Sequence, residues 1–518
     1  MAGAADVGTG WRSCAGRSTV ILSELLQSLN RSDVAVDLHS VSAAASRVSV
    51  SAITYDSRRA QPGSLFVALK GQRADGVSFA KEAVGRGAVA IVSETAPTGE
   101  VSVPWVRVLN GRLALALLAD AFHRNPSSEM AVVGITGTNG KTTTAYLVST
   151  LFEAAGVKSG LLSTVTYRIG DEEREASRTT PEASDLQAML REMVERGCGA
   201  CAMEVSSHAL SLHRVDGMRF SAAVFTNLTR EHLDFHGDMA GYFAAKRKLF
   251  EMLPAGAPAA INLDDPYGKA LIEIVSRPVT YAINQPADVT PGPLSFSMEG
   301  LDFEVRTPRG LIRVRSTLVG RPNVYNLLAA VTTCTALDLP FTAIEKGLAS
   351  LAGVPGRFQV VSTSADDVVV IVDYAHTDDA LRSVLETARP LASGRLITVF
   401  GCGGERDRTK RPLMGAVAAR LSDLVIITSD NPRGEDPMRI IEEIKRGLSP
   451  SGTEHLIYED RGAAIHKAVD VARPTDTILL AGKGHEKFQV IGNRAEPFDD
   501  VAVARDALAK RRAKLRVC

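Results

Sequence analysis

The chain has 518 residues, of which 45% are apolar and 23% are charged, and its formal net charge is zero. A chain of this length is too long for one hydrophobic core, so we expect about two to four domains. The balanced charge argues against a broad basic surface for nucleic acid or acidic lipid. No apolar run is long enough to span a bilayer, and residues 1–18 lack the apolar core of a secretory signal. These features predict a cytoplasmic protein without membrane insertion or a nucleic-acid partner.

The cysteines and the first residues of the chain carry little functional signal. Six cysteines are few for this length and predict reduced thiols. Cys198 and Cys201 have CxxC spacing, but no second pair accompanies them and the residues that follow predict a buried strand. We therefore favour a structural role there over a metal or redox site. Residues 1–18 are rich in Gly, Ala and Ser without periodicity, which predicts a flexible tail.

Residues 19–110 predict a small α/β domain. Apolar runs at Ser64–Leu69 and Ala88–Val92 predict strands, and the more polar stretch Phe79–Gly87 predicts a helix between them. Two loops in this domain, Tyr55–Arg58 and Gly71–Gly76, are dense in hydrogen-bond donors. Taken by themselves these residues favour turns over ligand-binding loops.

The segment Gly134–Thr142, with the sequence GITGTNGKT, predicts a phosphate-binding loop. It lies between an apolar run, Ala131–Ile135, and a predicted helix, Lys141–Ala155. Backbone N–H groups at such a helix start point toward an anion, Lys141 adds a charge, and Thr142 offers a hydroxyl to Mg²⁺. We expect the triphosphate of ATP as the ligand. The general pattern has glycine at the position of Ile135, so a glycine-rich turn without a ligand stays an alternative.

Apolar runs alternate with predicted helices over residues 111–352, which is typical of a mostly parallel sheet covered by helices. The predicted strands are Ala131–Ile135, Leu161–Val165, Ala202–Val205, Ala222–Phe225, Ala259–Ile261 and Val279–Ile283. Polar motifs follow three of them, at residues 179–182 (TTPE), 204–208 (EVSSH) and 226–234 (TNLTREHLD). We expect a ligand site there, because ligands of such sheets bind at the carboxyl ends of the strands. Glu204 and His232 could hold Mg²⁺ against a phosphate, and the alternatives are a capping carboxylate and a surface histidine.

Residues 353–518 resume the alternation and predict a second doubly wound, Rossmann-like domain. Its predicted strands are Val368–Val372, Leu396–Phe400, Leu424–Thr428 and Thr477–Leu480. Each runs into polar or glycine-rich residues, at 373–376 (DYAH), 401–407 (GCGGERD), 430–433 (DNPR) and 482–486 (GKGHE). We expect these four endings to lie together at one edge of the sheet, which we call the rim of this domain. We expect the rim to face the ATP domain across a cleft. Gly353–Arg357 predicts a hinge between the two domains.

Seven motifs, in this order, resemble the Mur ligases of peptidoglycan synthesis. They are residues 137–142 (GTNGKT), 204–208 (EVSSH), 232–237 (HLDFHG), 242–246 (YFAAK), 323–326 (NVYN), 373–376 (DYAH) and 482–486 (GKGHE). The resemblance extends from about Tyr55 to Phe498, and within the family it is strongest to members that add 2,6-diaminopimelate. It implies an N-terminal domain for UDP, a central P-loop-type ATPase domain and a C-terminal domain for the amino acid. We expect a monomer that acts on small molecules.

The resemblance assigns roles to residues that match the family's motifs. For the nucleotide it implies Gly137, Thr138, Asn139, Gly140, Lys141, Thr142, Thr143, Asn323, Asn326, Arg357 and Asp373. For a UDP-muramoyl dipeptide it implies two groups: around the UDP, Tyr55, Ser57, Gln72, Arg73 and Ala74, and at the muramoyl dipeptide, Thr179, Thr180, Ser206 and Arg214. For diaminopimelate it implies Arg406, Asp430, Asn431, Pro432, Arg433, Gly482 and Glu486. The catalytic residues it implies are Lys141, Glu204, His232 and Lys246, with Mg²⁺ held by Thr142, Glu204, His232 and Lys246.

The chemistry implied by the resemblance is ATP-dependent amide ligation. The γ-carboxylate of D-glutamate in UDP-N-acetylmuramoyl-L-Ala-D-Glu takes the γ-phosphoryl group of ATP, and the amine of meso-diaminopimelate then displaces phosphate. Lys246 is implied to act as a carbamate formed with CO₂, which offers Mg²⁺ two oxygens where an ammonium would repel it. The helix around Lys246 favours, by its own amphipathic pattern, an exposed lysine.

Two positions depart from the family's pattern. Leu212 stands where many relatives carry glutamine, which would remove one hydrogen bond to the substrate. Asp378 follows Thr377 where the family usually has proline, and we expect this to alter only a loop.

Three other functions stay open. A lysine-adding muramyl ligase is disfavoured by Asp430–Arg433, and a folylpolyglutamate synthetase by the N-terminal UDP loops. A nucleotide-binding scaffold without catalysis is a different class of protein. It is disfavoured because a dead site need not keep Lys141, Glu204, His232 and Lys246 together.

Overall fold

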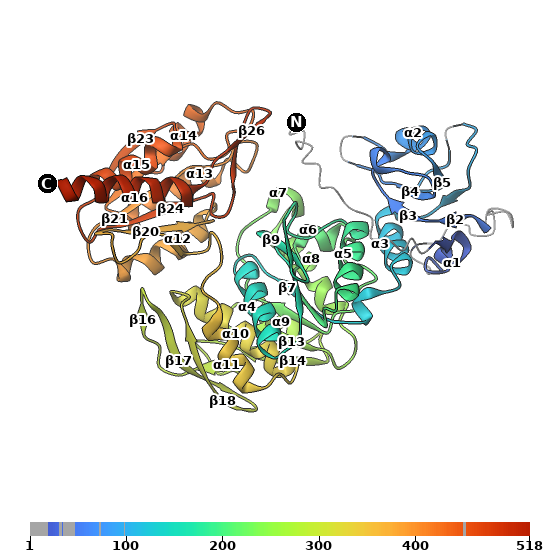
Figure 1. The fold of residues 1–518 in the computed structure, drawn as a ribbon, viewed down its shortest axis with the longest axis horizontal. Helices are drawn as coiled ribbons and strands as arrows, with labels where there is room; N and C mark the ends of the chain where they lie inside the picture. The colour runs from blue at the N-terminus through green and yellow to red at the C-terminus, as the bar shows by residue number, and fades with distance from the viewer. Residues whose placement is uncertain are drawn as a thin grey trace.

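The structure, a computed structural model, describes residues 19–30, 34, 47–71, 74–97, 99–448 and 452–517. Three α/β domains follow one another along the chain (Figure 1), and the predicted fold class is confirmed. The predicted tail, residues 1–18, lies outside the described residues. Within the described ranges, every helix is too short or too polar to cross a membrane.

The N-terminal domain, blue in Figure 1, is built on a parallel sheet in the order β3-β4-β5-β6. β4 is buried along its whole length, because it lies between two strands and under helices. Both predicted strands are confirmed, whereas the predicted helix is shorter than expected: Phe79 ends a 3₁₀ turn, and the helix stops at Gly85, before Gly87 with its positive φ of 103°. The elements are β1 (Val20–Ile21), α1 (Leu22–Gln27), β2 (Ser49–Val50), β3 (Ala52–Thr54), β4 (Ser64–Ala68), α2 (Ala80–Gly85), β5 (Ala88–Ser93), β6 (Trp105–Arg107) and α3 (Gly111–Phe122).

The central domain contains an eight-stranded sheet in the order β10-β9-β8-β11-β7-β12-β13-β14. Neighbouring strands are parallel except at the β8-β9-β10 edge. The strands are β7 (Ala131–Thr136), β8 (Ser159–Leu162), β9 (Thr166–Ile169), β10 (Glu172–Glu175), β11 (Ala200–Glu204), β12 (Ala222–Phe225), β13 (Pro258–Asn262) and β14 (Arg277–Tyr281). The helices among them are α4 (Lys141–Ala154), α5 (Ala183–Glu195), α6 (Ser207–Ser211), α7 (Leu233–His236), α8 (Met239–Glu251) and α9 (Gly268–Ile272). All predicted strands are present, with ends moved by a few residues.

Cys198 and Cys201 belong to the core of this domain. Both are buried and neither forms a disulfide. Burial raises the pKa of the Cys201 thiol, as is usual for an inert core cysteine.

A small antiparallel sheet was not predicted. It consists of β15 (Thr290–Pro291), β16 (Phe296–Ser297), β17 (Gly300–Thr307) and β18 (Gly310–Ser316). β17 alternates between buried and exposed side chains, so it covers the core with one face only.

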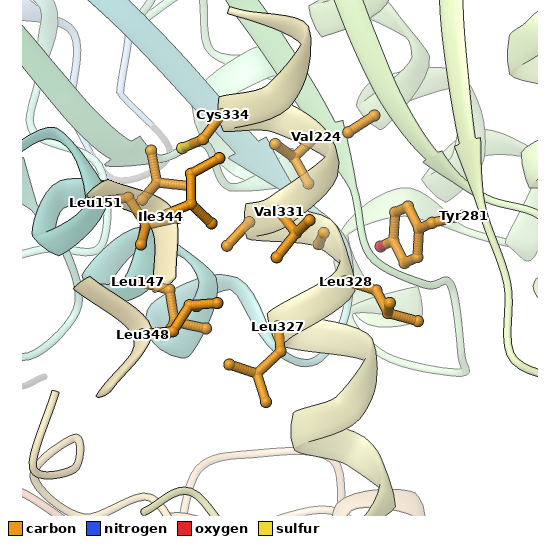
Figure 2. Close-up of a cluster of buried hydrophobic side chains, with 14 of the residues drawn as sticks. Leu147, Leu151, Val224, Tyr281, Leu327, Leu328, Val331, Cys334, Ile344 and Leu348 are labelled. Carbon is orange, nitrogen blue, oxygen red and sulfur yellow. The ribbon is translucent and has the colours of Figure 1, made fainter. Parts of the chain in front are cut away.

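Helices α10 (Arg321–Ala336) and α11 (Phe341–Ser350) pack against α4 beneath the central sheet. Figure 2 shows Leu147 and Leu151 of α4 among side chains of these two helices. Burial of each such leucine contributes about 1.5–3 kcal/mol. This packing holds α4, whose first residue is Lys141, in a fixed place against the sheet.

The C-terminal domain has a sheet in the order β19-β20-β24-β21-β22-β23, parallel except at β19. Its strands are β19 (Gln359–Val360), β20 (Val369–Asp373), β21 (Leu396–Phe400), β22 (Leu424–Thr428), β23 (Glu454–Tyr458) and β24 (Thr477–Ala481), with a separate hairpin, β25 (Phe488–Ile491) and β26 (Arg494–Pro497). Its helices are α12 (Asp378–Ala388), α13 (Lys410–Leu421), α14 (Pro437–Lys445), α15 (Arg461–Val471) and α16 (Asp500–Val517). The four predicted strands are the buried ones, and the strands not predicted lie at the edges or outside the sheet. Movement at the predicted hinge, Gly353–Arg357, stays a prediction.

Candidate active site

Two neighbouring cavities lie between the central and C-terminal domains. The first, of about 280 Å³, is lined by the phosphate loop, α10 and the start of the C-terminal domain. The second, of about 570 Å³, is lined by loops after central-domain strands and by the rim of the C-terminal domain. Residues lining both are Thr179, Ser206, Glu231, His232, Tyr374, His376 and Thr377. Ligands in the two cavities would therefore meet at these side chains, and the predicted rim does face the central domain.

The phosphate loop lies at the start of α4, as predicted. Gly140 has φ 86°, and a Cβ there would lie 2.4 Å from the Oδ1 atom of Asn326, so no side chain fits. The Nζ atom of Lys141 donates to the carbonyl oxygens of Gly137, at 3.0 Å, and Thr138, at 2.7 Å. The loop thus places a cation and the positive end of a helix at one point, which is the arrangement that binds phosphate.

The other residues assigned to the nucleotide gather around this loop. An Nη2–H group of Arg357 donates to Oγ1 of Thr142 at 3.1 Å, and its guanidinium lies 4.7 Å from the ring centre of Tyr374. Asp373, at the end of β20, accepts the N–H groups of Phe358 and Ala375. All the assigned nucleotide residues except Gly137 line the first cavity. Arg357 therefore connects the C-terminal domain directly to the phosphate loop.

Glu204 lies at the end of β11 with no exposed surface and lines the first cavity. Its carboxylate accepts hydrogen bonds from the N–H group of Thr164, at 2.8 Å, and from the Thr164 hydroxyl, at 3.2 Å. It forms no ion pair within 4.0 Å with any described residue. A buried carboxylate without a paired cation suits a metal ion, and the Thr142 hydroxyl in the same cavity is a second oxygen that could bind Mg²⁺.

Lys246 of α8 is only 2% exposed, so the expectation of an exposed lysine from the helix pattern is wrong. Its Nζ atom donates to the carbonyl oxygen of Gly137 at 2.7 Å and lies 4.6 Å from the ring centre of Tyr242. Burial, together with the charge of Lys141, lowers the pKa of Lys246 well below its usual value. The uncharged amine, which is the form that reacts with CO₂, is thereby favoured.

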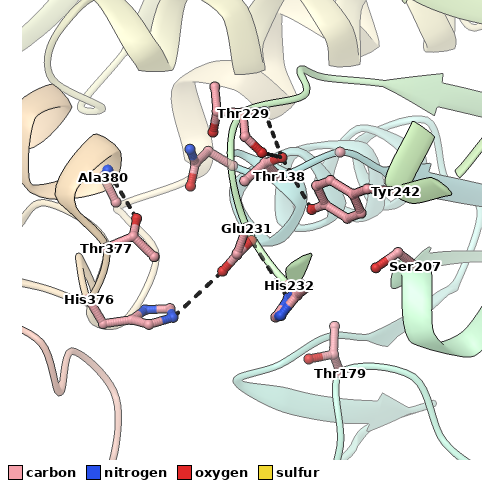
Figure 3. Close-up of polar contacts among 12 residues, drawn as sticks. Thr138, Thr179, Ser207, Thr229, Glu231, His232, Tyr242, His376, Thr377 and Ala380 are labelled. Carbon is pink, nitrogen blue, oxygen red and sulfur yellow. Dashed lines mark hydrogen bonds and ion pairs between the residues drawn. The ribbon is translucent and has the colours of Figure 1, made fainter. Parts of the chain in front are cut away.

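Glu231 occupies the junction of the two cavities, and its role was not foreseen from the sequence. Its carboxylate lies 3.7 Å from Nε2 of His232 and 3.7 Å from Nε2 of His376 (Figure 3). Burial raises the pKa of Glu231, but the two histidines and two nearby lysines outweigh burial and hold this pKa below its usual value. Glu231 therefore lies between a histidine of each domain, but neither 3.7 Å contact is a hydrogen bond, and burial lowers the pKa of both His232 and His376. Glu231 belongs to the polar motif at residues 226–234, but no local pattern distinguishes it from its neighbours in that motif.

No group of three or more His, Cys, Asp and Glu side chains is arranged to hold a metal in the described part of the chain. Glu204 and His232 both line the first cavity with Thr142 and Lys246.

The second cavity brings together two groups of residues that the resemblance assigned to different substrates. The dipeptide group from the central domain is Thr179, Thr180, Ser206 and Arg214. The diaminopimelate group from the C-terminal domain is Arg406, Asp430, Asn431, Arg433, Gly482 and Glu486. Pro432 lines neither cavity.

The C-terminal wall of this cavity is a hydrogen-bonded network. Asn431 donates through Nδ2 to Glu486 at 2.9 Å, and buried Lys483 donates to Oδ1 of Asn431 at 3.1 Å and to Glu486 at 3.0 Å. Arg433 has φ 52° and donates through Nη1 to the carbonyl oxygen of Gly404 at 2.8 Å. Lys483 was not assigned a role, although it lies in the GKGHE motif. The network fixes both acidic and basic groups at the cavity wall.

Comparison with known proteins identifies the family. The matching family descriptions are "Mur ligase family, catalytic domain" for residues 49–123, "Mur ligase middle domain" for 135–334 and "Mur ligase, glutamate ligase domain" for 356–484. A relative from Solibacter usitatus (strain Ellin6076), named UDP-N-acetylmuramoyl-L-alanyl-D-glutamate--2,6-diaminopimelate ligase, is 46% identical over 462 residues, covering 89% of this chain and 93% of its own. The chain belongs to the Mur ligase family.

Further similarity extends over nearly all of this Mur ligase. A relative of the same name from Gloeobacter violaceus (strain ATCC 29082 / PCC 7421) is 47% identical over 468 residues, covering 90% of this chain and 95% of its own. A solved structure of a protein with that name has a TM-score of 0.67 and 33% identity, and covers 95% of this chain and 99% of its own. The predicted family and the predicted enzyme class, a ligase, are confirmed.

Among the residues of this Mur ligase assigned to UDP, Tyr55, Ser57 and Ala74 line neither of the two cavities. Tyr55 donates to Asp185 of α5 at 3.5 Å, and Ser57 donates to Glu82 at 2.8 Å. Burial, with the charge of Asp185, raises the pKa of Tyr55 to about 12. Ala74 is exposed, and Gln72 and Arg73 lie outside the described residues. A UDP site in this domain stays a prediction.

The two departures from the family's pattern have different settings. Leu212 directly follows α6 and precedes by two residues Arg214, which lines the second cavity. Asp378 is the first residue of α12 and lines the second cavity, so the expectation that it alters only a loop is wrong. An acidic side chain in the first turn interacts favourably with the helix dipole, which is why the helix can begin there without proline.

Proposed function

We propose that this Mur ligase joins meso-2,6-diaminopimelate to the γ-carboxylate of D-glutamate in UDP-N-acetylmuramoyl-L-Ala-D-Glu, with ATP as the activator. The observation that carries the proposal is the second cavity, where residues matching the dipeptide site face residues matching the amino-acid site. It adjoins the phosphate loop through shared lining residues. The names of the relatives from Solibacter usitatus and Gloeobacter violaceus support the same reaction.

The reaction needs phosphate, carboxylate and amine at one point. Lys141 and the N–H groups at the start of α4 would bind the transferring phosphoryl group and offset the charge that builds between two anions. The carboxylate would enter from the second cavity, past Thr179 and Ser206, and leave the first step as an acyl phosphate. The amine would then attack from the C-terminal wall. Holding the three reactants together removes much of the entropic barrier.

Mg²⁺ fits the oxygen donors of the first cavity. Thr142 and Glu204 would hold one ion, and His232 with Lys246 as a carbamate would hold a second. The bound ions would neutralise charge between the phosphate and the substrate carboxylate. The low pKa of Lys246 and its closeness to Lys141 support the carbamate, because an ammonium there would repel both the lysine and a metal.

The choice of amino acid is proposed to rest on charge matching at the second cavity. Arg406 and Arg433 offer two cations, and Asp430 and Glu486 offer two anions. Meso-diaminopimelate carries two carboxylates and two ammonium groups, whereas L-lysine has only one carboxylate. L-Lysine would leave the half-buried Arg433 without its anion. A site built to pair with a charged group strongly rejects a substrate that lacks that group.

Arg433→Lys is expected to raise the KM for meso-diaminopimelate by about 10-fold or more, because an ammonium cannot copy the planar fork of a guanidinium. The measurement is phosphate release with varied diaminopimelate at saturating ATP and dipeptide. Arg408→Lys is the matched control, since Arg408 is exposed, pairs with Glu443 and lines neither cavity. Equal catalytic efficiency of the unmodified enzyme with L-lysine and diaminopimelate would refute this assignment.

A steady-state phosphate-release assay tests the proposed function as a whole. Release is expected only when ATP, the UDP-muramoyl dipeptide and meso-diaminopimelate are present together. Release with L-lysine in place of diaminopimelate would favour a lysine-adding ligase, and release with a folate and glutamate would favour a folylpolyglutamate synthetase. Nucleotide binding without release under any combination would favour a scaffold.

A further inference from the structure

Glu182, at the N-terminus of α5, is the meeting point of three arginines. Its carboxylate lies 2.8 Å from an Nη atom of Arg214, 3.5 Å from one of Arg178 and 3.7 Å from one of Arg112. The three come from separate places in the chain: Arg112 from α3, Arg178 from the loop after β10, and Arg214 from the loop after α6. Glu182 itself is only 6% exposed.

Arg214 is held in one position by this contact. It is 8% exposed, and its other Nη atom donates to the carbonyl oxygen of Thr180 at 3.0 Å. Its Nε atom is buried and has no hydrogen-bond partner among the described residues. Arg178 and Arg214 both line the second cavity, whereas Glu182 does not. The carboxylate therefore contacts two arginines of the cavity wall without lining the cavity itself.

The charges around Glu182 do not balance. Three guanidinium groups face one carboxylate, so this wall of the cavity keeps an excess of positive charge. Arg214 is buried and Arg178 is half exposed, and the single carboxylate of Glu182 does not neutralise both, so an anion bound in the cavity beside them would be favoured. The proposed dipeptide substrate brings one, because its terminal D-glutamate has a second carboxylate that does not react.

We propose that Glu182 is a positioning residue, which holds Arg214 and Arg178 so that they bind the unreactive carboxylate of the acceptor's terminal glutamate. This inference rests on the proposed function and deepens it. It predicts that the enzyme distinguishes the acceptor from its analogue with an amide in place of that carboxylate. A neutral amide leaves the arginine pair without its anion.

Glu182→Gln tests this inference, because the amide has the same shape but cannot hold three cations. We expect the KM and the directly measured Kd for the UDP-muramoyl dipeptide to rise by about 10-fold or more. The KM values for ATP and diaminopimelate should stay within about 2-fold. Preference for the acceptor over its amide analogue should shrink. If Glu182 served only to balance charge, the KM and Kd for the acceptor should fall instead. Loss of the carboxylate would make the wall more positive, and the anionic acceptor would bind more tightly.

Glu192→Gln is the matched control. Glu192 lies on the same helix and pairs with Arg174 and Arg196, but it lines neither cavity. Glu182→Asp keeps the charge and should recover part of the loss. If Glu182→Gln does not fold, Arg178→Gln serves in its place, because Arg178 is half exposed and its loss should weaken acceptor binding without affecting ATP.

Several results would overturn the inference. They are tighter or unchanged acceptor binding in Glu182→Gln, an equal loss in Glu192→Gln, and an unmodified enzyme that does not distinguish the amide analogue. Failure of the proposed function would give a different result: the unmodified enzyme would neither bind nor turn over the UDP-muramoyl dipeptide. The inference would then fall together with the proposed function.

Discussion

Lys141→Ala is expected to lower turnover by roughly 1,000-fold or more at saturating ATP. The lysine is the first residue of α4, and the carbonyl oxygens of Gly137 and Thr138 hold its ammonium in the loop beside the helix start, where N–H groups would bind a phosphate. Negative charge builds at that point as the phosphoryl group moves between two anions. Removing the cation therefore raises the energy of the transition state more than that of the bound substrate.

The measurement for Lys141→Ala is phosphate release with all three substrates saturating, together with circular dichroism to show that the fold is retained. Lys158→Ala is the control, because Lys158 lies beyond the other end of α4 and forms a surface ion pair with Asp171. Turnover close to that of the unmodified enzyme would show that Lys141 does not act on the transferring phosphate.

Lys246→Ala is expected to lower turnover by at least about 100-fold. A buried lysine with a lowered pKa, within hydrogen-bonding distance of the phosphate loop, is suited to a carbamate that holds Mg²⁺. Alanine removes both oxygens of the carbamate and leaves a space next to Tyr242. Acetate can occupy that space and offer two oxygens, so it should restore part of the activity.

Arg247→Ala is the matched control for Lys246→Ala. Arg247 is the next residue on α8, but it is exposed and pairs with Glu251. Activity should be measured against Mg²⁺ concentration, with and without acetate, and the mass of the intact protein should be compared after exposure to CO₂. A near-normal rate in Lys246→Ala, or an unchanged dependence on Mg²⁺, would exclude the carbamate.

Local patterns were sufficient for the parts of the fold that are buried and regular. β7, β12, β21 and β22 are short apolar runs between helices, and such runs have few alternatives to a central strand. The phosphate loop is equally local, since a buried strand, a glycine turn and a helix start follow one another within residues 131–154. The family and its motifs were also recognisable from the sequence.

Elements with one exposed face were missed. β15 and β16 are only two residues long, and β17 and β18 alternate between buried and exposed side chains around glycine turns. Such segments are stabilised by pairing with each other, and that pairing is not visible in any one of them.

The site depended most on tertiary structure. The sequence by itself determined which residues carry charge and hydroxyl groups at strand ends, and it therefore indicated Lys141, Glu204 and Arg433. Only the folded chain decided that Lys246 is buried against the phosphate loop and that Glu231 reaches His376 of another domain. Burial and the distances between residues far apart in the chain follow from how the helices and domains pack, so a pKa or an ion pair that depends on them has no local signal.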